Sequence, residues 1–147
     1  MADVFEFPLR ARYMEVDAQG VVFNGWYLTF FDEAMTAFLA ARGASYATLA
    51  AAGVDVQLVH VEVDWTAGLR YGEDFTVAVS TARVGRTSFA LDFQTRRDGE
   101  ATCSARIVYV VMAIDSSGKL AAGGSGKRPV PALLAAALGD PAPLRAP

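Results

Sequence analysis

The segment from residue 25 to residue 42 constrains the fold more than any other part of this sequence. Aromatic and aliphatic residues recur there at helical spacing, and Gly43 follows as a stop signal. The polar positions form only a thin stripe, made of Thr29, Asp32, Glu33 and Thr36. A helix that is apolar around most of its circumference is normally surrounded by other structure. We therefore expect the rest of the chain to wrap this helix.

The remainder of the chain has mostly the alternating pattern of β-strands. Expected strands cover residues 5–13, 54–66, 73–84, 87–97 and 101–114, with a short helix at 46–52. The apolar phase changes within the second strand, which predicts a bulge near Leu58. Turn residues at 84–86 and 98–99 predict antiparallel hairpins. The predicted fold class is α+β, a long central helix wrapped by a curled antiparallel sheet of about five strands.

The chain length, 147 residues, is that of a single domain. We expect this domain to cover residues 1–131, followed over residues 132–147 by a short helix and a frayed tail. Hydrophobic residues make up 53% of the chain and charged ones 20%, which indicates that some surface is covered by another copy. The strand at 101–114 becomes apolar on both faces after Ile107, and this also predicts a homodimer or homotetramer.

Charge and hydropathy exclude several classes of partner. The net charge is −3 and the 13 basic residues are scattered, so we expect no nucleic-acid binding. The most apolar stretch, residues 107–114, is far shorter than the ~20 residues of a membrane span. No signal-peptide pattern precedes residue 10, so we expect a cytoplasmic protein. Cys103, the one cysteine, lies on the apolar phase of its strand and is expected to be buried.

The stretch RYMEVDAQGVVFNGWY carries the main candidate site. Asn24 is a favoured N-cap residue, and the first N–H groups of the helix, near Asn24, Gly25 and Trp26, suit an oxyanion. Asp17, tethered by a turn at Gly20, can face that helix end as a base or nucleophile. An Asp before such a turn also commonly bonds the N–H groups of the turn itself. The residues alone therefore leave a catalytic and a structural role open.

The longer stretch RYMEVDAQGVVFNGWYLTFFDEA resembles the signature of the hotdog-fold acyl-CoA thioesterases of the 4-hydroxybenzoyl-CoA thioesterase type. The matching positions are Tyr13, Asp17, Gly20, Val21, Val22, Tyr27, Leu28 and Phe31. The resemblance extends in outline over residues 5 to about 131. It implies that Asp17 is the catalytic carboxylate, that the helix start polarises the thioester carbonyl, and that the site lies at a dimer interface. Asn24 departs from the pattern, since many bacterial members carry His or Tyr there, and this leaves the acyl specificity open.

The function implied by this resemblance is hydrolysis of an acyl-CoA thioester to the free acid and CoA. An aromatic acyl group is one option, and we expect no metal and no organic cofactor. A non-catalytic acyl-CoA-binding or scaffold domain is the alternative. Hydration or dehydration of acyl thioesters needs a His beside an acid, which the position of the single histidine, His60, does not favour.

Three further groups of polar residues are candidates for binding or structural roles. The hairpin ARVGRTSF is similar to the segment that receives the CoA phosphates in relatives, and it is equally typical of a solvated turn. Its polar residues are Arg83, Arg86, Thr87 and Ser88. His60 shares the polar phase of its strand with acidic residues and is expected to be a structural or interface residue. Glu15 alternates away from Asp17 and is expected to be a solvated or helix-end charge.

Overall fold

The computed structural model describes residues 4–120 and 126–146, so residues 1–3, 121–125 and 147 of the predicted domain and tail lie outside the described residues. Along the chain the elements are β1 (Phe5–Arg10), the 3₁₀ helix η1 (Tyr13–Glu15), α1 (Trp26–Ala41), α2 (Tyr46–Ala51), β2 (Val54–Trp65), β3 (Asp74–Val84), β4 (Ser88–Arg97), β5 (Glu100–Ala113) and α3 (Ala132–Leu138). The predicted first strand therefore ends at Arg10, because η1 turns the chain away from the sheet.

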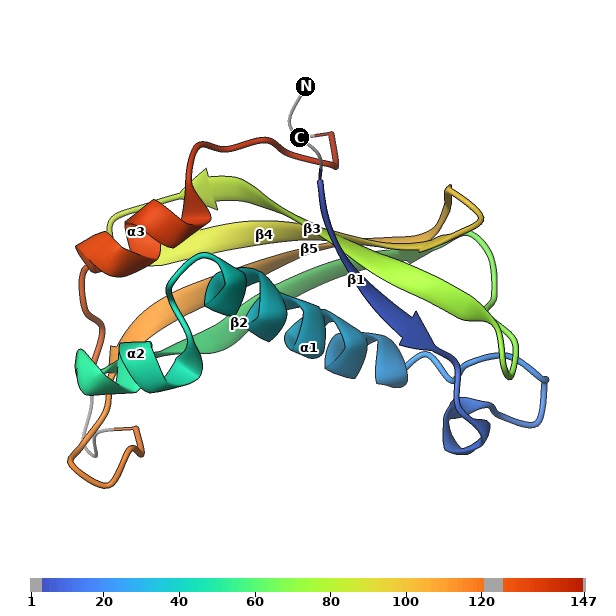
Figure 1. The fold of residues 1–147 in the computed structure, drawn as a ribbon, viewed down its shortest axis with the longest axis horizontal. Helices are drawn as coiled ribbons and strands as arrows, with labels where there is room; N and C mark the ends of the chain where they lie inside the picture. The colour runs from blue at the N-terminus through green and yellow to red at the C-terminus, as the bar shows by residue number, and fades with distance from the viewer. Residues whose placement is uncertain (1–3, 121–125, 147) are drawn as a thin grey trace.

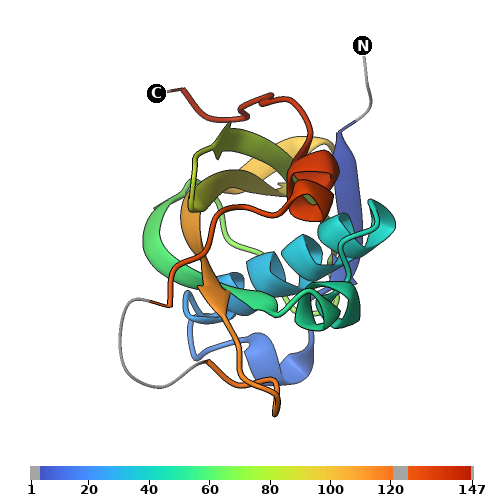
Figure 2. The same ribbon diagram turned by 90° about the vertical axis from the view of Figure 1, so that its left-hand side faces the viewer.

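The strands form one antiparallel sheet in the order β1-β3-β4-β5-β2. The sheet curves, and α1 lies along its concave side (Figures 1 and 2). Both predicted hairpins are present, between β3 and β4 and between β4 and β5. The register of β2 shifts between Leu58 and His60, which confirms the predicted bulge. The α+β prediction of a central helix in a curled five-stranded sheet is confirmed.

The core forms between the apolar side of α1 and the concave face of the sheet. Phe31 lies 5.0 Å from the ring of Phe93, and Phe30 lies 5.2 Å from Phe75, measured between ring centroids. Cys103 is buried in this core as predicted. The sheet covers only one side of α1, and Leu28 on the opposite side is 42% exposed together with the polar stripe. Within one chain the helix is therefore only partly wrapped. No helix in the described part of the chain combines the length and apolarity needed to cross a bilayer.

The residues after α3 run across the outer face of the sheet. The N–H of Ala142 donates to the carbonyl oxygen of Thr81 at 2.8 Å. The guanidinium of Arg145 donates to Asp64 Oδ2 at 2.8 Å and to Ser104 O at 2.8 Å. We expected a frayed tail from its proline content, and the described part of the tail differs from that expectation because polar groups on β2, β3 and β5 bind it.

Asp92 on β4 holds the tail and the sheet together. Its carboxylate is fully buried on the outer face and accepts hydrogen bonds from Arg106 Nε and Nη2 at 2.7 and 2.9 Å. The backbone N–H groups of Leu144 and Arg145 also donate to it, at 2.8 and 2.9 Å. Burial alone would raise the pKa of Asp92, but these hydrogen bonds outweigh burial and lower that pKa below its usual range.

We predict that Asp92→Asn lowers the free energy of unfolding by about 2–4 kcal/mol at pH 7, because Arg106 and two tail N–H groups lose a charged acceptor. The lowered pKa means that the wild-type stabilisation is present above the unfolded-state value of about 4 and is lost as pH falls through the folded-state pKa. The variant should therefore show a flatter acid dependence in urea unfolding. Asp64→Asn removes only an exposed partner of Arg145 and should cost less than about 1 kcal/mol. Equal losses in the two variants would contradict the assignment.

Candidate active site

Asp17 lies in the loop between η1 and α1, where it closes a tight turn. Its N–H donates to Val21 O at 3.0 Å, and its own carbonyl oxygen accepts from Gly20 N at 3.0 Å. One carboxylate oxygen, Oδ1, accepts from Gln19 N at 2.8 Å. The other oxygen, Oδ2, makes no hydrogen bond with the described residues. Asp17 therefore does stabilise the turn through Oδ1, and Oδ2 remains available to act on a substrate.

The start of α1 differs from the prediction at Asn24. The cap position is Gly25, whose backbone is already helical, and the Asn24 side chain makes no capping bond. The N–H of Trp26 donates to Phe23 O at 3.0 Å, so it is not available to a ligand. The N–H groups of Asn24 and Gly25 donate to no acceptor among the described residues. A backbone hydrogen bond to Phe23 O thus replaces the predicted side-chain cap. The N–H groups of Asn24 and Gly25 remain without an acceptor among the described residues.

Glu15 was expected to be a solvated or helix-end charge; it lies at the end of η1 and is buried, not solvated. Its carboxylate accepts from the N–H of Arg12 at 2.8 Å and from Arg12 Nη2 at 2.9 Å. Its carbonyl oxygen accepts from Phe23 N at 2.8 Å. Glu15 therefore ties the two ends of the Asp17 loop together. The Arg-x-x-Glu spacing at 12–15 is the sequence signal that could have indicated this pair.

A second loop, residues 66–73, packs against the Asp17 loop. The N–H of Val22 donates to Leu69 O at 2.8 Å, and Leu69 is fully buried. A Cβ at Gly68 would lie only 2.7 Å from Val21 Cγ1, so the close approach requires glycine there. Arg97 holds this second loop through a 2.7 Å bond to Gly68 O. Sequence reasoning gave no role to these supporting residues.

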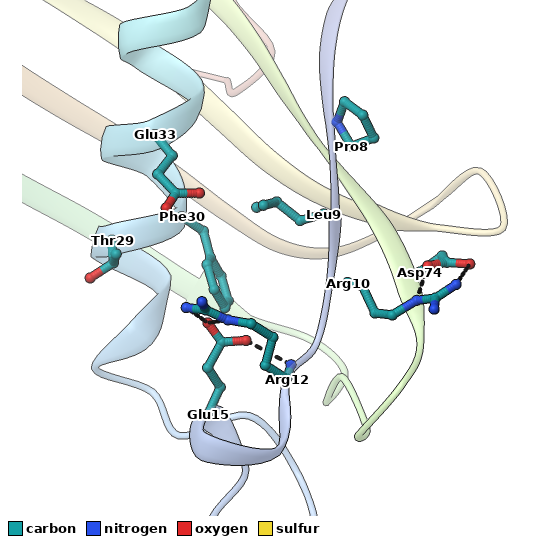
Figure 3. A pocket seen from close by; sticks show the side chains of 9 residues that line it. All are labelled: Pro8, Leu9, Arg10, Arg12, Glu15, Thr29, Phe30, Glu33 and Asp74. Atoms are coloured by element: carbon teal, nitrogen blue, oxygen red, sulfur yellow. Dashed lines mark hydrogen bonds and ion pairs between the residues drawn. The ribbon is translucent and has the colours of Figure 1, made fainter.

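Clefts lie on both flanks of the exposed side of α1. The β1-side cleft, about 450 Å³, lies beside the Arg12–Glu15 pair and Glu33 (Figure 3). The β2-side cleft, about 540 Å³, lies between α1, Tyr46 of α2, and β2. Asp17 lines neither cleft. In the β2-side cleft, burial first and the nearby Asp55 second raise the pKa of Asp32 above its usual range.

The predicted phosphate-binding residues are not close to Asp17 within one chain. The carbonyl oxygen of Thr87 accepts from Val111 N, and Val111 pairs with Val56, so this hairpin lies at the Val54 end of β2. The ring of Tyr27 contacts that of Trp65 at 6.0 Å, so α1 starts at the other end (Figure 1). At about 3.3 Å per residue the two ends are roughly 30 Å apart.

The hairpin itself carries exposed positive charge. Arg83 and Arg86 are both exposed, and Arg83 Nη2 lies 3.4 Å from Ser88 Oγ. His60 is exposed on β2, with Nε2 3.4 Å from Glu62 Oε1, which agrees with a surface or interface position. Among the described residues, no group of three or more His, Cys, Asp or Glu side chains is arranged to hold a metal ion.

Comparison with known proteins identifies the family. The model of the thioesterase superfamily matches residues 19–104, more than half of the chain. The chain belongs to the thioesterase superfamily. The match begins two residues after Asp17 and therefore does not test the role of that residue. The predictions of a hotdog fold and of a thioester-hydrolysing enzyme are confirmed at this level, whereas the narrower 4-hydroxybenzoyl-CoA type is not specifically shown.

Individual relatives agree with this assignment. A 1,4-dihydroxy-2-naphthoyl-CoA hydrolase of Synechococcus elongatus is 25% identical over 114 residues, which cover 76% of this chain and 83% of that protein. A solved structure from Aquifex aeolicus is 25% identical with a TM-score of 0.72, over 74% of this chain and 86% of that one. A gentisyl-coenzyme A thioesterase has a TM-score of 0.79 at 20% identity, over 92% of this chain and 100% of that one, which shows a shared fold.

We predict that Glu15→Ala lowers the free energy of unfolding by about 1–3 kcal/mol, because the N–H and guanidinium of Arg12 lose their buried acceptor. The double variant Glu15→Ala/Arg12→Ala should cost less than the sum of the two single variants, since both substitutions remove the same contact. A double-mutant cycle by urea unfolding measures the coupling, expected to be at least about 1 kcal/mol. Additive losses would show that the pair does not hold the loop.

Proposed function

We propose that this protein hydrolyses an acyl-CoA thioester, with Asp17 as the nucleophile or general base. The observation that carries the proposal is the position of Asp17 in a thioesterase-superfamily chain. One of its carboxylate oxygens closes the turn, and the other makes no bond with the described residues. The same loop ends at the two unbonded N–H groups of Asn24 and Gly25. An aromatic acyl group, as in the 4-hydroxybenzoyl-CoA type, is supported by the acyl groups that two relatives are named for.

The chemistry follows from these two groups. As a nucleophile, Asp17 Oδ2 attacks the thioester carbon, CoA leaves as its thiolate, and water then cleaves the mixed anhydride to release the acid. As a general base, Asp17 takes a proton from water while the water oxygen attacks the same carbon, and the C–S bond then breaks to release CoA as its thiolate and the free acid. In both routes the N–H groups of Asn24 and Gly25 donate to the carbonyl oxygen as negative charge develops on it. We propose that neither route needs a metal or an organic cofactor.

The open edge of β2 supports a site shared by two subunits. β2 is the last strand of the sheet, and Val59 and Trp65 on it are 53% and 49% exposed. An unpaired edge of this kind joins readily to another strand. A two-fold axis would pair β2 antiparallel with its copy, which brings the Trp65 end of one chain to the Val54 end of the other. Asp17 of one subunit would then meet the β2-side cleft and the Arg86 hairpin of its partner.

This arrangement explains why residues predicted for one site lie at opposite ends of one chain. CoA carries phosphates, and the guanidinium groups of Arg83 and Arg86 are exposed where the partner's thioester site would be. The hydroxyls of Thr87 and Ser88 belong to the same hairpin. We propose a homodimer as the smallest active unit, with a homotetramer as a further assembly of such dimers.

Asp17→Asn should preserve folding and substrate binding and abolish most turnover, because an amide is neither a base nor a strong nucleophile. The expected loss in kcat is on the order of 10²–10⁴-fold for a general base and larger for a nucleophile. A thiol-release assay over an acyl-CoA panel measures it. Asp98→Asn, an exposed turn carboxylate elsewhere, is the matched control and should keep wild-type activity.

Single turnover in ¹⁸O-labelled water separates the two roles of Asp17. A mixed anhydride can leave label in the Asp17 carboxylate, whereas general-base hydrolysis labels only the acid product. If Asp17→Asn keeps most of its kcat, Asp17 is a turn-forming residue and the proposed mechanism is wrong. If the wild-type protein binds acyl-CoA and hydrolyses none of the panel, it is the non-catalytic binding domain.

Arg86→Ala should raise KM for acyl-CoA about tenfold and change KM little for a short pantetheine thioester, since only acyl-CoA carries the nucleotide phosphates.

Mixing the Arg86→Ala variant with Asp17→Asn tests whether two subunits share one site. Subunit exchange gives mixed dimers with one intact site, so kcat/KM should rise to about a quarter of wild type. Mixing Arg86→Ala with the Asp17→Asn/Arg86→Ala double variant is the control and should restore nothing. Equal loss on both substrates would reject the phosphate role, and no recovery on mixing would reject the shared site.

A further inference from the structure

Tyr109 carries a polar atom that the fold leaves without a partner. Among the residues that the structure describes, its hydroxyl is the one buried side-chain oxygen or nitrogen with no hydrogen bond. The residue is 1% exposed, so bulk water does not serve as the partner. Buried polar groups are nearly always hydrogen-bonded, and each exception calls for an explanation.

The position of the Tyr109 ring is fixed. It lies on the concave face of β5, in register with Leu58 of β2 and Phe89 of β4. The ring stacks on Phe89 with centroids 5.3 Å apart and planes 20° from parallel. A buried ring stacked in this way cannot move its hydroxyl oxygen toward another acceptor without disturbing the core.

Tyr109 borders the β2-side cleft from below its surface. Tyr109 lines that cleft together with Asp32 of α1 and Asp55 of β2. The cleft volume, about 540 Å³, is within the range of small-molecule sites. Burial first and the Asp32 carboxylate second raise the pKa of Tyr109 above its usual range. The phenol therefore keeps its proton near neutral pH and is a hydrogen-bond donor at the wall of an acidic cleft.

We infer that the Tyr109 hydroxyl is a specificity-determining donor for an oxygen atom, most simply a hydroxyl group, on the acyl part of the substrate. A ligand hydroxyl can accept from the phenol of Tyr109 and donate to a neighbouring carboxylate, so it satisfies both kinds of group in the cleft. An acyl group without that oxygen leaves the buried phenol unbonded and binds less well. This inference rests on the proposed function, since it takes the β2-side cleft as the place where the acyl group binds.

Tyr109→Phe tests the inference because it removes one oxygen atom and no protein hydrogen bond. The variant should fold with unchanged or higher stability in urea. Rates are compared on matched pairs of substrates: benzoyl-CoA against its 3-hydroxy and 4-hydroxy derivatives, and 2-naphthoyl-CoA against 1,4-dihydroxy-2-naphthoyl-CoA. The wild type should prefer the hydroxylated partner of at least one pair, and Tyr109→Phe should reduce that preference in kcat/KM about tenfold. Comparing the two proteins cancels the effect of the hydroxyl on the intrinsic reactivity of the thioester.

Tyr46→Phe provides the comparison for loss of a hydroxyl at the mouth of the same cleft, where Tyr46 is 58% exposed. This variant should keep the wild-type preference. The inference is overturned if Tyr109→Phe leaves the preference unchanged, if it slows both partners of each pair equally, if Tyr46→Phe removes the preference instead, or if the wild type prefers no hydroxylated substrate.

Failure of the proposed hydrolysis is distinguished by a binding measurement. If no thioester is turned over, non-hydrolysable thioethers of CoA carrying benzyl and hydroxybenzyl groups are titrated by calorimetry. The wild type should bind a hydroxybenzyl thioether about tenfold more tightly than the benzyl one, and Tyr109→Phe should bind both equally. Tighter binding without turnover supports the role of Tyr109 and rejects the enzyme, whereas equal binding by the wild type rejects the role of Tyr109.

Discussion

The burial of one side of α1 in the concave sheet is the constraint on which the rest of the structure depends. Phe31 against Phe93 and Phe30 against Phe75 fix both the rotation and the position of the helix along the strands. The contact of Tyr27 with Trp65 then sets where the helix begins. This packing therefore determines the position of the loop before α1, which includes Asp17. A shift of the helix by one turn would move that loop by roughly 5 Å.

The Asp17 loop is held as firmly as a secondary structure element, though it has little regular structure of its own. Glu15 joins its two ends through Arg12 and through the carbonyl bond to Phe23. The hydrogen bond from Val22 N to Leu69 O fixes the loop against the second loop, residues 66–73. Reactive carboxylates need such support, because small displacements of a catalytic group cost much of the rate. The ion pair of the buried Glu15 with Arg12 thus positions the loop that carries Asp17.

The hydrophobic core is complete within one chain, but one side of α1 remains uncovered. The sheet covers one side of α1, so the other side carries clefts and exposes Leu28. The edge of β2 is unpaired, whereas the outer face of the sheet is partly covered by the C-terminal tail bound to Asp92. Association through the β2 edge would therefore cover exposed apolar surface. It would also bring the Trp65 end of one subunit to the Val54 end of its partner.

The sequence by itself determined the central helix, the two hairpins, the bulge near Leu58 and the burial of Cys103, and it singled out Asp17 in a pattern typical of one thioesterase type. All of these depend on periodicity and on neighbouring residues, which a linear chain displays directly. Only the tertiary structure decided that Glu15 is buried, that a backbone turn replaces the cap at Asn24, and that the Tyr109 hydroxyl lacks a partner. These depend on which distant segments meet and on how much space remains between them, because burial and hydrogen bonding are properties of the packed chain and not of the residues alone.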